Sequence, residues 1–211
     1  YLGFKVNDGE YKVMGLAPYG EPVYADLIKE RLVDIKADGS FRLRMENFNY
    51  CTGLTMTNAR FDEIFGGPPR NPAEPLSQRH MDLARSVQVV TEEIVLGICR
   101  DAQRQTGLNN LCLAGGVALN CVANGRIIRE GPFDNVWIQP AAGDAGASLG
   151  IALAISYELG GLERKIPAVS ADHMRGSYLG PAFDAEDIES MLRSHDAVFE
   201  TVDDDVLYNR V

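Results

Sequence analysis

Apolar residues recur with the period of an α-helix over residues 77–107, and this pattern is the longest structural signal in the chain. The positions that recur at steps of three and four residues are Leu83, Val87, Val90, Ile94 and Ile98. Ser77 stands just before the pattern, where a residue that caps the first helical turn is expected. We therefore predict a long amphipathic helix that begins after Ser77.

Short apolar runs alternate with helical patterns in the stretch that follows. The runs at 110–114 and 135–140 predict strands, and the patterns at 117–131 and 145–161 predict helices. Both strands are too apolar for one face to lie in water, which is typical of a parallel pair covered by helices. The predicted fold class is therefore α/β, with a parallel pair of strands buried by helices.

The rest of the chain predicts shorter elements. In chain order they are a strand at 1–6, a turn at 7–10, a mixed segment at 11–22, a short amphipathic helix at 23–33, a hairpin at 34–48 and a helix from 184 onward. The hairpin turns at Asp38 and Gly39, and Asp184 stands near the cap of the last helix. Residues 49–75 are polar and rich in Gly, Pro and Asn, so no element is assigned to them. Residues 162–183 resemble a linker.

Charge and hydropathy narrow the classes of partner. The chain has 211 residues, with 20 Lys and Arg against 30 Asp and Glu, and a net charge of −10. A protein that holds nucleic acid through many phosphate contacts usually presents a basic surface, so nucleic acid is not expected as a partner. No apolar run approaches the roughly 20 residues of a membrane helix, and residues 1–12 do not resemble a signal peptide. We expect a cytoplasmic protein without a membrane partner.

The cysteines support the same compartment. They are widely spaced, form no CxxC motif and stand at Cys51, Cys99, Cys112 and Cys121. Cys112 and Cys121 lie inside apolar patterns, which predicts buried free thiols in a reducing cytosol rather than disulfides or a zinc site.

Both ends of the chain look like cuts through folded protein. Tyr1 opens a predicted strand, and residues 203–211 stop where a capped helix has just begun. We therefore expect a fragment whose first partner is the rest of its own polypeptide, and a homo-oligomer is compatible with this expectation.

Glycines stand at both places where a predicted strand gives way to a helix. Gly115 and Gly116 follow the first strand, and Gly143 and Gly146 flank Asp144 after the second. Ligands of parallel α/β sheets collect at the carboxyl ends of the strands, and helix N-termini there suit phosphate. If the strands are neighbours, both turns open on one edge and could hold a nucleotide, with Asp144 reaching a metal bound to its phosphates.

Simpler interpretations of the same residues remain open. A glycine turn between a strand and a helix is common in packing, and Asp144 is a good N-cap for a helix that starts at Ala145. Asn120 could reach a nucleotide or lie on a solvated helix face. Lys12 could neutralise a phosphate, although its spacing alone favours a surface lysine. Arg70 is interpreted as a surface arginine in a loop.

Several longer motifs resemble one enzyme family. They are "GEYKVMGLAPYGEP", "YCTGLTMTNARFDEIFGGPPR", "RHMDLARSVQ", "LCLAGGVALNCVANG" and "QPAAGDAGASLGIAL". Together they resemble the O-carbamoyltransferases, which modify nodulation factors, cephem antibiotics, aminoglycosides and ansamycins. The resemblance covers nearly the whole chain. It implies the second half of a transferase domain with an actin/Hsp70/sugar-kinase-like (ASKHA) fold, close to the universal tRNA threonylcarbamoyl-transfer proteins.

The resemblance also implies roles for individual residues. Those that match the family's nucleotide motif are Gly115, Gly116 and Asn120, whereas Asp144 matches a metal ligand. Glu10 and Lys12 fall in a loop near the nucleotide. The family's paired histidines (HxxxH) and first phosphate loop are absent from this sequence. The implied division is a partial transfer domain at 1–161, a linker at 162–176 and the start of a carbamoyl-adenylate-forming domain at 177–211.

The implied chemistry has two steps. Carbamoyl phosphate and ATP give carbamoyl adenylate and pyrophosphate, and the carbamoyl group then passes to a hydroxyl of a small-molecule acceptor. A divalent metal on Asp144 would neutralise the phosphate of the leaving group. One carboxylate does not choose between iron, magnesium and manganese. The sequence names neither the acceptor nor the general base.

Other functions compete with this one. A tRNA threonylcarbamoyl-transfer protein is the nearest, but the acidic balance and the segments "KVMGLAPYG" and "FGGPPR" favour the small-molecule branch. A small-molecule kinase of the same fold would form ADP, whereas a carbamoyltransferase forms AMP. A non-catalytic nucleotide-sensing module would bind ATP without turnover.

Overall fold

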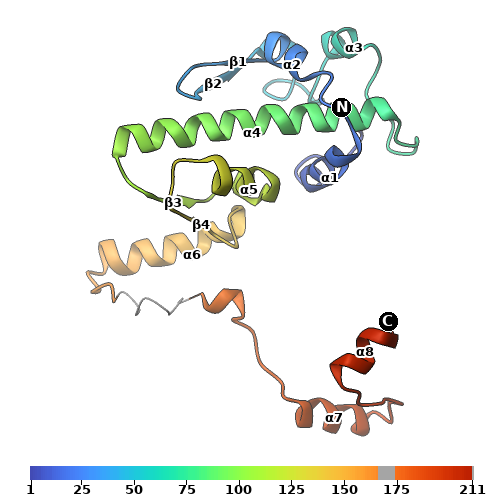
Figure 1. The fold of residues 1–211 in the computed structure, drawn as a ribbon, viewed down its shortest axis with the longest axis vertical. Coiled ribbons are helices and arrows are strands. Elements are labelled where there is room, and N and C mark those ends of the chain that lie inside the picture. Colours follow the sequence, from blue (N-terminus) through green and yellow to red (C-terminus); the bar gives the residue numbers. More distant parts are fainter. Residues whose placement is uncertain (166–173, 211) are drawn as a thin grey trace. The chain divides into compact units, whose positions relative to one another are not determined.

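The computed structural model describes residues 1–165 and 174–210. They form two compact units, Tyr1–Leu162 and Glu163–Val211. The longest element of the first unit is the helix α4 (Gln78–Thr106), and shorter helices of this unit pack against it (Figure 1). The functional domain boundaries expected from the sequence stay a prediction.

The prediction of a long helix after Ser77 is confirmed. Ser77 is the N-cap, and its backbone N–H donates a hydrogen bond to His80 Nδ1 at 3.0 Å, which closes a capping box. Gly107 ends the helix with a φ of 67°, in the left-handed region where glycine is favoured.

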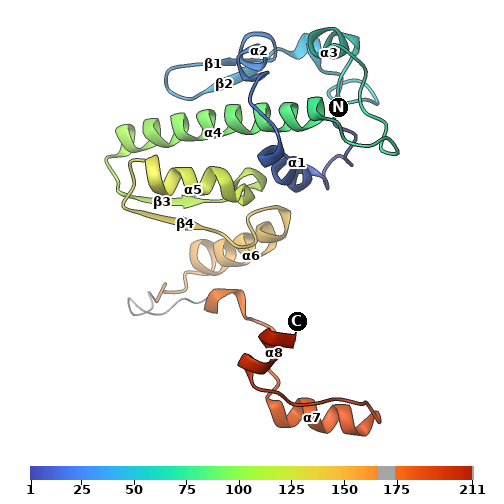
Figure 2. The same cartoon turned by 45° about the vertical axis from the view of Figure 1, so that its right-hand side comes forward.

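Short elements from the first part of the chain lie on two sides of α4, with α1 on the opposite side from α2 (Figures 1 and 2). They are α1 (Glu10–Leu16), η1 (Ala17–Tyr19), α2 (Ala25–Arg31), β1 (Val33–Ile35), β2 (Phe41–Leu43), η2 (Met45–Asn47) and α3 (Ala59–Phe65). β1 and β2 pair antiparallel, with Val33 opposite Leu43, so the predicted hairpin is confirmed. The predicted amphipathic helix is α2, and its buried Ile28 joins a core with Phe61 and Leu83.

Two expectations about this part are corrected. Residues 1–6 form no strand, because no neighbouring strand among the described residues supplies a ladder; the backbone O of Tyr1 accepts from the Arg70 N–H at 3.0 Å instead. Arg70 itself is buried rather than on the surface, and its Nε donates to Leu2 O at 2.8 Å. Residues 49–75 contain α3, which Asn58 caps by accepting from the Arg60 N–H.

The predicted pair of parallel strands is confirmed. β3 (Asn110–Leu113) pairs parallel with β4 (Asn135–Ile138), and the register places Leu113 beside Ile138. The crossover runs through η3 (Gly116–Leu119) and α5 (Cys121–Glu130). Both views show α5 between α4 and the strand pair (Figure 2), where buried Ile127 contacts Leu96 of α4.

The expectation that helices bury both faces of this pair is wrong for the described residues. α5 covers the face that carries Leu111 and Val136. On the other face Cys112 is exposed and Trp137 keeps 46% of its surface accessible. The next helix, α6 (Asp144–Ala154), continues into a π-helical turn, η4 (Ile155–Leu159), and none of its own residues is buried.

The cysteine prediction is half right. All four thiols are free, but only Cys99 is buried. Cys112 is exposed because it lies on the open face of the strand pair, and Cys121 because it begins α5 beside Met14.

The second unit contains η5 (Arg175–Ser177), α7 (Ala185–Ser194) and α8 (Asp204–Arg210). Asp184 caps α7 by accepting from the Asp187 N–H at 2.9 Å, which confirms the prediction for this helix. Part of the expected linker lies outside the described residues. No helix in the described ranges is both long and apolar enough to cross a membrane.

Candidate functional site

A cavity of about 690 Å³ opens where β3 and β4 give way to the elements that follow them. Its lining includes residues that the sequence had singled out, namely Glu10, Gly116, Asn120, Gly143 and Asp144. Tyr11, Met14 and Thr91 also line it and were not anticipated. The structure therefore brings together residues from widely separated parts of the chain, as expected for ligands at the carboxyl ends of parallel strands.

The two glycine turns are joined by a hydrogen bond. The N–H of Gly115 donates to the carbonyl O of Ala142 at 2.7 Å, so the turn after β3 is tied to the turn after β4. Gly115 has a φ of 98°, which L-residues with side chains rarely adopt. Gly115 is therefore needed for backbone geometry at the joint between the two turns.

The other glycines divide into open and packed positions. A Cβ added at Gly116 or Gly143 would meet no heavy atom within 4 Å, so packing in the described chain does not require glycine there. Their backbones are left open to the cavity, which suits a ligand that approaches closely. At Gly146 a Cβ would clash with the backbone O of Ala141, so packing accounts for this glycine. Its contact with a nucleotide stays a prediction.

Asp144 lies at the start of α6, and its carboxylate has no hydrogen-bond or ion-pair partner among residues 1–165 and 174–210. Gly143, not Asp144, is the N-cap, and no side-chain bond caps the helix, so the N-cap interpretation of Asp144 is wrong. The helix simply begins one residue earlier than expected. Its first N–H groups have no partner inside the helix, and the positive end of the dipole favours a negative charge at this position.

Metal binding at Asp144 stays a prediction. Within residues 1–165 and 174–210 there is no group of three or more His, Cys, Asp or Glu side chains able to hold a metal ion. A hard divalent cation takes about six oxygen ligands, so Asp144 fits as one carboxylate of a site that phosphate oxygens and other ligands complete.

Asn120 is held firmly and is not a solvated helix residue. Its Oδ1 accepts from the Ala123 N–H at 3.0 Å, which caps α5. It also exchanges two hydrogen bonds with the amide of Gln88 on α4, at 2.9 and 3.1 Å.

Behind Gln88 lies an ion pair that the sequence did not reveal. Gln88 and Glu92 are 4% and 3% exposed, and Gln88 Nε2 donates to Glu92 Oε1 at 2.9 Å. Arg126 of α5 donates to Glu92 Oε2 at 3.0 Å and also to both carboxylate oxygens of Glu130. The hydrogen bonds to Glu130, and then the one to Glu92, raise the pKa of the Arg126 guanidinium, so it stays charged. A buried carboxylate is tolerated because these donors compensate its lost hydration.

The loop before α1 supplies the remaining predicted residues. Glu10 accepts from the Asn7 N–H at 3.0 Å and lines the cavity. Lys12 is exposed, lies over the ring of Tyr11 and is not among the cavity residues. The arrangement therefore supports Glu10 as a site residue more than Lys12, whose contact with a nucleotide stays a prediction.

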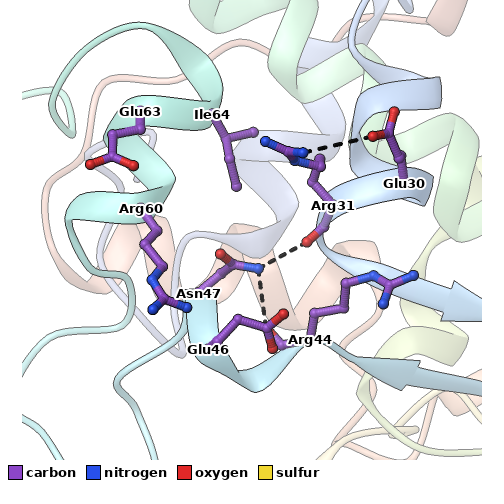
Figure 3. Close-up of a pocket in the computed structure, with 8 residues that line it drawn as sticks. All are labelled: Glu30, Arg31, Arg44, Glu46, Asn47, Arg60, Glu63 and Ile64. Atoms are coloured by element: carbon purple, nitrogen blue, oxygen red, sulfur yellow. Dashed lines mark hydrogen bonds and ion pairs between the residues drawn. The ribbon is translucent and has the colours of Figure 1, made fainter.

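A second pocket, of about 510 Å³, differs in character (Figure 3). Basic and acidic side chains alternate around it, from α2, η2, its N-cap residue and α3: Arg31, Arg44, Arg60, Glu30, Glu46 and Glu63. The amide of buried Asn47 is occupied, because it donates to Arg31 O at 2.8 Å and Arg44 O at 3.2 Å. The charges balance and no sequence-predicted residue lies here, so this pocket is better explained as a polar junction between elements.

Comparison with known proteins adds an independent observation. Residues 1–153 match the family model of the carbamoyltransferase N-terminus. An uncharacterized protein of Synechocystis sp. is 57% identical over 213 residues, which cover 100% of this chain and 34% of that protein. The nodulation protein NolNO of Sinorhizobium fredii is 41% identical over 76% of this chain and 22% of its own length. The nodulation protein NolO of Bradyrhizobium diazoefficiens is 39% identical over 76% of this chain and 27% of its own length. The chain thus spans about a third of these relatives or less.

Proposed function

This chain belongs to the carbamoyltransferase family, and we propose that its full-length protein transfers a carbamoyl group to a hydroxyl of a small-molecule acceptor. The proposed donor is carbamoyl phosphate, which reacts with ATP and water to give carbamoyl adenylate, pyrophosphate and phosphate. The acceptor oxygen then bonds to the carbamoyl carbon, the bond from that carbon to the adenylate oxygen breaks, and AMP leaves. The proton of the acceptor hydroxyl passes to a base.

The observation that carries this proposal is the cavity at the ends of β3 and β4. It places the open backbones of Gly116 and Gly143, the amide of Asn120 and the free carboxylate of Asp144 around one space. Backbone N–H groups and an amide donor suit the phosphate and ribose oxygens of a nucleotide. Asp144 would hold a divalent cation that neutralises charge on the departing phosphate.

The acidic balance of the chain fits a small-molecule acceptor better than tRNA. With a net charge of −10, the chain offers little electrostatic attraction for a polyanion. A phosphate held by backbone groups within a cavity needs no basic surface. We therefore place the acceptor among hydroxylated small molecules, including sugars and natural products.

The test follows the fate of ATP in the full-length protein. The protein is incubated with ATP, carbamoyl phosphate and a hydroxylated acceptor panel, and AMP, ADP and pyrophosphate are quantified for the wild type and Asp144→Asn. We expect pyrophosphate from both proteins, because adenylate formation is retained in each. AMP together with carbamoylated acceptor should come from the wild type and be lost in Asp144→Asn. The matched control is Asp26→Asn, which removes an exposed carboxylate on α2, outside the cavity.

Each alternative gives a different result. Formation of ADP with a phosphorylated acceptor would identify a kinase of the same fold. Tight ATP binding without any product, with carbamoyl phosphate present, would identify a nucleotide-sensing module. Equal transfer by the wild type and Asp144→Asn would remove Asp144 from the transfer site.

A further inference from the structure

Asn120 reaches the candidate nucleotide cavity at the end of a chain of hydrogen bonds that passes through buried side chains. The members of this α4–α5 polar chain are Arg126, Glu92, Gln88 and Asn120, in that order. Glu92 and Gln88 are buried, whereas Asn120 lines the cavity. The chemistry of each member fixes the orientation of the next.

The orientation starts at Glu92. An ionised carboxylate only accepts hydrogen bonds, and Arg126 lies 3.0 Å from its Oε2. Gln88 must therefore turn its NH₂ group, not its carbonyl, toward Glu92 Oε1, which lies 2.9 Å from Nε2. Glu92 thus selects one of the two amide orientations of Gln88.

Gln88 passes this selection on to Asn120. Gln88 Oε1 accepts from Asn120 Nδ2 at 2.9 Å, and Gln88 Nε2 donates to Asn120 Oδ1 at 3.1 Å. The Ala123 N–H independently donates to the same Oδ1 at 3.0 Å. A flipped Asn120 would set its NH₂ group against two donors, so the observed orientation is strongly preferred.

A tally of hydrogen-bonding capacity shows what Asn120 can still offer. An amide oxygen has two lone pairs, and Ala123 and Gln88 occupy both at Oδ1. An amide NH₂ group has two hydrogens, and Gln88 takes one of them. One N–H donor is left at Asn120, and its acceptor capacity is used within the protein.

We infer that Gln88 and Glu92 are positioning residues that hold Asn120 as a single hydrogen-bond donor to the ligand in the cavity. The ligand atom at Asn120 is then an acceptor, such as a phosphate or ribose oxygen or a ring nitrogen of the nucleotide. A ligand group that only donates has no partner there. This inference rests on the proposed nucleotide site and adds the support behind it, since neither residue belongs to the recognised glycine motifs.

The test is a double-mutant cycle on the full-length protein. Calorimetry measures the Kd of a non-hydrolysable ATP analogue for the wild type, Gln88→Met, Asn120→Ser and the double variant. Asp144→Asn spares any ATP site in the expected adenylate-forming domain, so the binding step that it weakens is the one assigned to this cavity. Serine keeps a side-chain oxygen for the cap of α5 but lacks the amide donor. We expect Gln88→Met to weaken binding about tenfold in the wild-type background, equivalent to about 1.4 kcal/mol. In the Asn120→Ser background, Gln88→Met should change the Kd less than about twofold. The effects of two substitutions do not add when one residue acts only by positioning the other.

The outcomes separate the inference from the proposed function. Equal weakening by Gln88→Met in both backgrounds, or none in the wild-type background, overturns the positioning role. A wild-type protein that does not bind the analogue defeats the proposed nucleotide site, and the positioning role with it. Gln103→Met, on α4 but outside the cavity, serves as the control for the substitution itself.

A second variant covers the case in which Gln88→Met does not fold. Glu92→Gln keeps the size of the side chain but can donate as well as accept, so Gln88 is no longer forced into one orientation. We expect about threefold weaker analogue binding in the wild-type background, or roughly 0.6 kcal/mol, and no change with Asn120→Ser. Equal effects in both backgrounds would again overturn the inference.

Discussion

Arg126 makes the sharpest test of the ion pair that joins α4 to α5. In Arg126→Met the apolar stem is largely kept, but Glu92 loses its closest cationic partner. Arg85 remains at 3.9 Å, and the Gln88 amide is the other donor left to this 3% exposed residue. Glu92 therefore becomes a buried carboxylate with little compensation.

The magnitude follows from what each bond of Arg126 is worth. Removing one partner of a buried ion pair typically costs about 3–5 kcal/mol, because the other charge stays buried. The guanidinium side chain is 27% exposed, so the lower end of that range applies. The bond to the exposed Glu130 adds roughly 0–1 kcal/mol. We expect a loss of about 3 kcal/mol in the stability of the contact between α4 and α5.

Hydrogen exchange on the full-length protein measures this loss locally. A loss of about 3 kcal/mol corresponds to roughly 150-fold faster exchange of protected amides in α5 and in the adjoining part of α4. The control Arg129→Met removes an exposed arginine three residues further along the same helix, and we expect less than about threefold acceleration.

The reasoning also predicts a partial rescue. Replacing both members by apolar residues removes the stranded charge, so Arg126→Met with Glu92→Met should exchange more slowly than Arg126→Met alone. An acceleration in Arg126→Met no larger than in Arg129→Met would refute the assigned cost of the buried carboxylate. A double variant worse than Arg126→Met would refute its physical explanation.

Two further predictions concern the cap of α4 and the glycine turns. Burial, then the charges of Arg79 and Arg70, lower the pKa of His80, whose neutral Nδ1 accepts from the Ser77 N–H. As the pH falls, the unfolded chain therefore takes up the proton on His80 before the folded chain does. Hydrogen exchange should show that amide protection in the first turn of α4 decreases as the pH drops from about 7 to about 5. In the control His80→Gln, which keeps an acceptor for the capping box, this protection should not depend on pH in that range. In the turns, Gly115→Ala should lower the unfolding free energy by about 1–2 kcal/mol because of its positive φ. Gly143→Ala should lower it by less than about 1 kcal/mol, the cost of alanine at an N-cap, because its Cβ meets no other atom. Gly143→Ala should instead weaken binding of the ATP analogue, so a large stability loss at Gly143 with unchanged binding would contradict the open backbone assigned to it.

The parts of the fold that the sequence predicted share a strong local signal. The α4 helix combines an apolar period with a cap at each end, and the β3–β4 pair combines apolar runs with glycine turns. These signals come from residues close together in the sequence, so the elements can be predicted without knowledge of the tertiary structure. The juxtaposition of the turns could be predicted because parallel neighbours must end on the same edge.

The errors have tertiary causes. The most buried stripe of α4 includes Ala84, Gln88, Glu92 and Leu96, whereas Val87 and Ile98 of the predicted apolar face stay partly exposed. The hydrophobic period alone cannot identify this buried face, because the side chains in its middle are the amide of Gln88 and the carboxylate of Glu92. These polar groups are buried only because residues of α5 and its N-cap supply their hydrogen-bond partners. Residues 1–6 have the composition of a strand, but a strand also needs a neighbour to complete its hydrogen bonds.

The bond from the Gly115 N–H to Ala142 O has a thermodynamic consequence for any pair of ligands in the cavity. A ligand bound at the first turn would contact a backbone that is hydrogen-bonded to the second turn, where a cation at Asp144 would bind. If one occupant shifts or stiffens this joint, it alters the free energy with which the second binds. Linkage requires that the second then alters the affinity of the first by the same factor. Nucleotide and cation would therefore titrate as one cooperative pair.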